Sequence, residues 1–184
     1  MSQLTEEAMQ AVLCVVRYLN QTQDDVLHIG GTNTNESVIE TYTDVNWASD
    51  PNANRKSTSG LIMKVFGSII TWNSHVQKCV ASSAVETEYI ASLAAAREAL
   101  FHRHLPCGLG FGDHTPTILT DNMGCIQVAN NLAMHSKLKH VDMKYHLIQD
   151  QVQEGNIEIK YVRTNDNIAD FLTKPVSKTL LAHT

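Results

Sequence analysis

Apolar residues recur every three or four positions near the start of the chain. They are Ala8, Val12, Val15 or Val16, and Leu19. This spacing places their side chains on one side of a helix, so residues 5–20 are predicted to be helical. The polar run from Gly30 to Asn35 then interrupts the pattern. Because such runs separate folded segments, we place the boundary of the main domain there.

Short apolar or alternating runs, which are typical of β-strands, follow this break. Residues 38–44 predict a strand, and residues 50–54 predict a turn. Residues 60–66 and 69–74 predict two further strands, joined in a tight hairpin at Gly67-Ser68. The first half of the main domain is therefore rich in predicted strands.

Helices and strands alternate in the second half of the chain. Residues 85–104 predict an alanine-rich helix that stops near Pro106 and Gly108. The remaining predictions are a strand at 117–120, helices at 122–131 and 139–153, a strand at 157–162 and a short helix at 166–173. This order of elements indicates an α/β fold with a five-stranded mixed sheet and helices packed on its faces.

Four acidic residues lie where a predicted strand ends or on a predicted helix. They are Asp44, Glu88, Asp121 and Asp170. A sheet-and-helix domain can bring such positions to one point, but at about 4 Å each like-charged pair costs on the order of 4 kcal/mol at an effective dielectric of 20. Divalent cations offset that cost, and carboxylate oxygens suit Mg²⁺ or Mn²⁺. The pattern therefore predicts a metal site with two-metal phosphodiester chemistry.

A choice arises between Glu86 and Glu88, which lie two residues apart on one predicted helix and so point to nearly opposite sides. Glu88 shares its side with small residues that can pack closely on a sheet. These are Ala91, Ser92, Ala95 and Ala99. We therefore place Glu88 in the acidic group and Glu86 in solvent.

Several short sequence blocks follow one another in a definite order. They are Tyr42–Ala48, Arg55–Gly60, Trp72–Ser74, Glu86–Ala91, Thr120–Asn122, Lys139–His146 and Ala169–Pro175. Together they resemble the ribonuclease H region of the Pol polyproteins of copia-type LTR retrotransposons. The resemblance covers roughly residues 38–175 and is specific because all the blocks occur in order. The first helix resembles the segment that connects a reverse transcriptase to its ribonuclease H domain.

This resemblance implies a ribonuclease H-like fold and a metal-dependent endonuclease that cuts the RNA strand of RNA–DNA hybrids. It implies two bound ions of Mg²⁺ or Mn²⁺, with Asp44 between them. Glu88 and Asp121 would hold one ion, and Asp170 would hold the other, which activates the attacking water. The expected partners are the hybrid and a reverse transcriptase domain in cis or trans.

The domain division follows from the same resemblance. Residues 1–35 would form the helix and linker of the connection, residues 36–176 the ribonuclease H-like domain, and residues 177–184 a short tail. We also expect a set of residues to contact the substrate. They are Arg55, Lys56, Ser57, Asn122, Lys139 and His140. The two tryptophans, Trp47 and Trp72, are expected to pack in the core.

The net charge of −5 changes this picture, because proteins that bind a polyanion tightly usually present a basic surface. It favours weak binding by this chain alone. It also leaves a second hypothesis open, in which the chain is a non-enzymatic relic of a retroelement and acts as an interaction or nucleic-acid-binding module. A transposase or integrase fits less well, because those enzymes use three carboxylates and the blocks here follow ribonuclease H order.

The start of the sequence bears on the compartment. Residues 1–7 are acidic and lack the charged and apolar layout of a secretory signal. No apolar run is long enough to span a membrane. The expected location is intracellular, in the cytoplasm or nucleus, with no membrane partner.

Overall fold

Five strands form one mixed sheet in the order β3-β2-β1-β4-β5. The structure, a computed structural model, describes residues 5–27, 29–30, 38–50, 55–130 and 146–175. The strands are β1 (Ile39–Asp50), β2 (Lys56–Val65), β3 (Ser68–Val76), β4 (Thr117–Thr120) and β5 (Glu158–Tyr161). Helices flank this five-stranded mixed sheet, as expected. The predicted α/β fold class is therefore confirmed.

The hairpin between β2 and β3 turns one residue earlier than predicted. Phe66 and Gly67 form the turn with φ angles of 50° and 77°, while Ser68 already pairs with Val65. Positive φ at both central residues is the geometry of a type I′ turn, whose twist matches that of the flanking strands. The prediction of Gly67-Ser68 was wrong because a phenylalanine gives no signal for a left-handed conformation.

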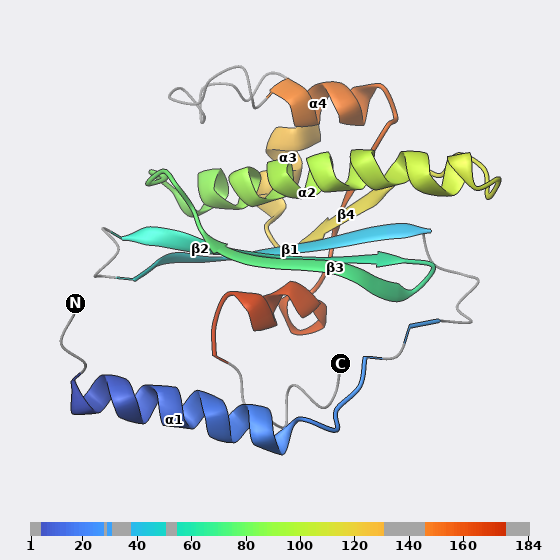
Figure 1. The fold of residues 1–184 in the computed structure, drawn as a ribbon. Helices are drawn as coiled ribbons and strands as arrows, with labels where there is room; N and C mark the ends of the chain where they lie inside the picture. Colours follow the sequence, from blue (N-terminus) through green and yellow to red (C-terminus); the bar gives the residue numbers. More distant parts are fainter. Residues whose placement is uncertain (1–4, 28, 31–37, 51–54, 131–145, 176–184) are drawn as a thin grey trace.

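Three helices lie on one side of the sheet (Figure 1). They are α2 (Ala84–Gly108), α3 (Met123–Asn130) and α4 (His146–Gln153). Helix α2 begins at Ser83, whose hydroxyl accepts a hydrogen bond from the Glu86 N–H at 3.2 Å. It continues through Pro106, beyond the predicted end. The predicted helix at 139–153 is described only from residue 146, because residues 131–145 lie outside the described part.

The hydrophobic core lies between the sheet and these helices. Its largest fully buried side chains include Ile39 of β1, Met63 of β2, Tyr89 of α2 and Ile118 of β4. The small residues of α2 bring that helix close to the strands, since Ala95 and Ala99 have no exposed surface. This close approach places the N-terminal part of α2 beside β1.

The opposite face of the sheet carries two short 3-10 turns, η3 (Thr164–Asp166) and η4 (Ile168–Leu172). The sequence predicted a single helix at 166–173. Asn167 divides the segment because its backbone is extended and its side chain caps η4 by accepting the Ala169 N–H at 3.2 Å. Asn167 also donates to the carbonyl oxygen of Thr43 in β1 at 2.8 Å, which fixes η4 to the centre of the sheet.

Helix α1 (Glu6–Gln21) lies on the side of the sheet away from α2 (Figure 1). None of its residues is buried, so its apolar side faces no core of the described chain. The predicted division at residue 35 stays a prediction. None of the helices in the described part of the chain combines the length and apolar character that a membrane crossing requires.

Both tryptophans depart from the predicted core packing. Trp47 on β1 is 53% exposed and Trp72 on β3 is 59% exposed. Trp72 belongs to the edge strand of the sheet and pairs with Ile62, on the face that carries η4. An edge strand has fewer neighbours to pack against, which explains the exposure of Trp72, whereas Trp47 lies on the central strand β1 and its exposure has no such explanation.

Candidate metal centre

Three carboxylates from three elements meet where β4 ends beside β1. Asp44 lies in β1, Glu88 lies near the start of α2, and Asp121 directly follows β4. Strands β1 and β4 are parallel neighbours, so their carboxyl-terminal portions lie on the same side. One oxygen from each of the three carboxylates lies within 4.8 Å of the other two.

Glu88 is the most deeply enclosed member of this group. It is 7% exposed, and within the described structure its Oε2 atom has no hydrogen-bond partner. Burial, followed by the charges of Asp44 and Asp121, raises the pKa of Glu88 to about 9. A buried acidic oxygen without a donor is costly, and a bound cation would satisfy it.

Asp44 is held by a hydroxyl group from the opposite face of the sheet. The Thr173 hydroxyl donates a hydrogen bond to Asp44 Oδ2. Burial raises the pKa of Asp44, the Thr173 hydrogen bond opposes that rise, and the charges of Asp170 and Asp121 add to it. Asp44 is therefore placed among other acids and has one oxygen already occupied.

Asp121 is more accessible and is oriented by η3. The Thr164 hydroxyl donates to Asp121 Oδ2 at 2.7 Å. The next residue, Asn122, accepts the Cys125 N–H at 3.0 Å and so caps the start of α3. This cap fixes the chain direction immediately after Asp121.

Asp170, the fourth predicted carboxylate, lies beside the three but is paired differently. The Lys174 ammonium contacts Asp170 Oδ1 at 2.7 Å, one helical turn along the chain. Asp170 acts electrostatically on Asp44, yet it is not one of the three residues whose oxygens lie within 4.8 Å of one another. The structure therefore shows a compact group of three with a neutralised fourth member.

Relatives of the sequence are found among Pol polyproteins of plant transposons. The chain is 34% identical over 173 residues to the retrovirus-related Pol polyprotein from transposon TNT 1-94 of Nicotiana tabacum, which covers 94% of this chain and 13% of the relative. It is 35% identical over 176 residues to that from transposon RE1 of Arabidopsis thaliana, covering 95% of this chain and 12% of the relative. This chain is homologous to one stretch of retrovirus-related Pol polyproteins.

The fold has counterparts among solved structures. The solution structure of the PFV ribonuclease H domain superposes with a TM-score of 0.50 and 16% identity, covering 79% of this chain and 94% of that domain. The likeness shows a ribonuclease H fold, as the resemblance implied. A scan against protein-family models found no match. The Pol homologues are far longer, so this chain spans about an eighth of their length.

The expected substrate-contacting residues fall into different environments. Arg55 is exposed and Lys56, at the start of β2, is half-buried. Ser57 is buried, and its hydroxyl accepts the Ala48 N–H at 3.2 Å, which gives it an internal structural contact. Lys139 and His140 lie outside the described residues.

Glu86, which was assigned to solvent, makes exposed local hydrogen bonds. Its Oε2 accepts hydrogen bonds from the Ser82 N–H at 2.7 Å and the Ser82 hydroxyl at 2.6 Å. Together with the Ser83 cap, these contacts close the first turn of α2. Glu88 rather than Glu86 therefore points to the acidic group.

Sequence reasoning gave no role to the side chains that contact the carboxylates. Thr164, Thr173 and Lys174 reach Asp121, Asp44 and Asp170 respectively. Only Lys174 had a readable signal, because it follows Asp170 by four positions. The two threonine contacts depend on η3 and η4 lying against the sheet.

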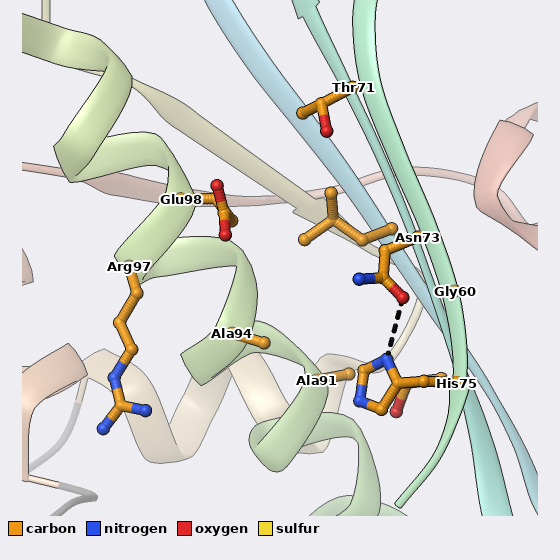
Figure 2. A pocket seen from close by; sticks show the side chains of 10 residues that line it. Gly60, Thr71, Asn73, His75, Ala91, Ala94, Arg97 and Glu98 are labelled. Atoms are coloured by element: carbon orange, nitrogen blue, oxygen red, sulfur yellow. Dashed lines mark hydrogen bonds between the residues drawn. The ribbon is translucent and has the colours of Figure 1, made fainter.

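A separate cavity of about 270 Å³ lies between β3 and α2. Figure 2 shows Asn73 and His75 on the strand facing Ala91 of the helix, with His75 hydrogen-bonded to Asn73. None of the four carboxylates lines it. Arg97 and Glu98, adjacent on α2, are also among its lining residues.

Proposed function

We propose that the chain is the ribonuclease H part of a retrotransposon polyprotein, a metal-dependent endonuclease that hydrolyses the RNA strand of RNA–DNA hybrids. The observation that carries the proposal is the buried, unpartnered Oε2 of Glu88, in a group with Asp44 and Asp121. Such an arrangement is unfavourable for a protein alone and favourable for a cation site. The ribonuclease H fold supports the same reaction class.

The residues present fit hard divalent cations. All the candidate ligands are carboxylate oxygens, which suit Mg²⁺ and Mn²⁺. Bound there, a pair of such ions would activate a water and stabilise the entering and departing oxygens of a phosphodiester. We assign Asp44 to the position between the ions, Glu88 and Asp121 to one ion, and Asp170 to the other.

The protein's own contribution is to hold these ligands in place before substrate arrives. Thr173 fixes one oxygen of Asp44, and Thr164 fixes one oxygen of Asp121. Glu88 is enclosed by the packing of α2 on the sheet. Each ligand therefore has little freedom to lose when a cation binds.

Discrimination between RNA and DNA would come from contacts with 2′-hydroxyl groups across the shallow minor groove of the hybrid. Arg55 and the exposed Trp47 are candidate contacts at the surface of the domain. The net charge of −5 predicts weak binding of the hybrid by this chain. A reverse transcriptase domain in cis or trans would supply the remaining affinity, and the exposed apolar residues of α1 are available for such a contact.

The test is cleavage of an end-labelled RNA–DNA hybrid with Mg²⁺, compared with duplex DNA and duplex RNA. Asp121→Asn is expected to lower the rate at least about 100-fold, since it removes a proposed ligand. Asp166→Asn is the matched control, because Asp166 is a nearby exposed acid of η3. Cleavage that persists in Asp121→Asn, or that needs no divalent ion, would refute the assignment.

The same assay addresses the alternative of a silent relic, which the net charge of −5 favours. A folded wild-type chain that cuts no hybrid at high enzyme concentration, with or without Mn²⁺, would support an interaction module. Hybrid-specific cleavage excludes it.

A further inference from the structure

Lys174 is placed where a cation would bind Asp170. Its ammonium lies 2.7 Å from Asp170 Oδ1, and its positive charge also acts on Asp44 and Asp121. The residue before it, Thr173, donates to Asp44 Oδ2. Two consecutive residues thus supply donors to the side of the site formed by Asp44 and Asp170.

The backbone that carries Lys174 is fixed to the sheet. The Leu172 carbonyl oxygen accepts from the Ser74 hydroxyl at 2.6 Å, and the Thr173 carbonyl oxygen accepts from Asn46 Nδ2 at 3.4 Å. Gly60 lets η4 approach, because a Cβ there would lie 2.6 Å from the Ala169 carbonyl oxygen. The position of Lys174 therefore follows from packing.

The four carboxylates differ in how they are neutralised. Among contacts within the described residues, Asp170 has an ammonium partner, whereas Asp44 and Asp121 accept hydrogen bonds from hydroxyl groups and Glu88 Oε2 has no partner. Within the described residues no ammonium forms an ion pair with Asp44, Glu88 or Asp121, so a first divalent ion meets no competing cation in contact with that group. A second ion at Asp170 has to displace the ammonium.

We propose that Lys174 is an internal cation that positions Asp170 in the metal-free chain and competes with a divalent ion for it. The inference rests on the metal site of the proposed function and adds the order in which two divalent ions bind there. The Asp44–Glu88–Asp121 side fills first, and the Asp170 side fills second and more weakly. Because the Lys174 side chain is 45% exposed, its ammonium can be hydrated once displaced.

Mn²⁺ titration calorimetry tests this order without any need for activity. The wild-type chain is expected to show a tighter and a weaker binding event. Lys174→Gln should tighten the weaker event on the order of 10-fold, because the competing charge is gone. Lys174→Arg should restore the wild-type affinity. Lys160→Gln is the matched control, since it removes a lysine paired with Glu158 at 2.6 Å on β5.

Asp170→Asn separates competition at Asp170 from a general effect of charge. Asp170→Asn should remove the weaker Mn²⁺ binding event and keep the tighter one. In the double variant with Lys174→Gln, Mn²⁺ binding should be the same as in Asp170→Asn alone. If Lys174→Gln does not fold, Asp170→Asn alone still tests whether the weaker Mn²⁺ binding event belongs to Asp170. Retention of both events in Asp170→Asn would overturn the proposal.

The remaining outcomes separate this inference from the proposed function. Equal weak-site affinity in wild type and Lys174→Gln, in a chain that binds Mn²⁺ and cuts hybrid, overturns the role of Lys174 alone. Absence of Mn²⁺ binding in both chains overturns the metal site as well. If Lys160→Gln tightens the weaker Mn²⁺ binding event as much as Lys174→Gln does, the effect is one of net charge and competition at Asp170 is contradicted.

Discussion

Replacement of Glu88 by glutamine is the sharpest perturbation of the site. Glutamine has nearly the same shape as a protonated glutamic acid but cannot ionise. In the metal-free chain the pKa of Glu88 is raised to about 9 by burial and by the neighbouring Asp44 and Asp121, so at neutral pH the wild-type side chain carries its proton. Glu88→Gln should therefore fold normally at pH 6, with nearly unchanged stability.

The difference appears as the pH rises. Between the ordinary pKa of 4.5 and the folded value of about 9, the unfolded chain has released the Glu88 proton while the folded chain still holds it. The wild-type protein consequently loses stability with increasing pH, by at most about 1.4 kcal/mol per pH unit. From pH 6 to pH 8 the loss from Glu88 is at most about 3 kcal/mol, and Glu88→Gln should lack it.

Urea unfolding of both chains in EDTA, at pH 6, 7 and 8, measures this difference. The free energy of unfolding should fall more steeply with pH in the wild type than in Glu88→Gln. Glu86→Gln is the control, because it removes an acidic group in the same turn of α2 but leaves Glu88 intact. Parallel pH profiles for wild type and Glu88→Gln would refute the reasoning.

Other predictions follow from the same geometry. Gly60→Ala should destabilise the fold by about 1–3 kcal/mol and weaken Mn²⁺ binding, since its Cβ would meet η4 at 2.6 Å; an unchanged melting temperature would contradict the close approach. Asn167→Ala removes the bond to the Thr43 carbonyl and should cost about 1–3 kcal/mol in urea unfolding, and a loss below experimental error would show that η4 is held otherwise. Mn²⁺ binding at pH 7 should release close to one proton from Glu88, measurable as a heat that changes with the ionisation enthalpy of the buffer, whereas equal heats in two buffers would exclude that release.

The sequence predicted the sheet well because its strands carry strong local signals. The strand at 117–120 matches β4, and the first strand, predicted at 38–44, begins one residue later at Ile39 and continues to Asp50. The errors lie where tertiary structure decides. Phe66 takes a left-handed conformation to suit the twist of the hairpin, and Asn167 divides the final segment because its side chain is used by β1 and η4.

In the candidate site, too, some residues have a signal in the sequence and others are placed only by the tertiary structure. Motif blocks and element order selected Asp44, Glu88 and Asp121, and the structure brings these three carboxylates together, while their role as metal ligands stays a prediction. The hydroxyl groups of Thr164 and Thr173 could not be selected, because their contacts span 43 and 129 positions of sequence. The pairing of Asp170 with Lys174 is local, but its meaning depends on the nearby acids.

Anomalous diffraction from crystals grown with Mn²⁺ tests the central claim most directly. The account predicts a strong peak within bonding distance of oxygens from Asp44, Glu88 and Asp121, and a weaker one beside Asp170 that strengthens as the Mn²⁺ concentration rises. Crystals saturated with Mn²⁺ that show no peak among the three carboxylates would contradict it.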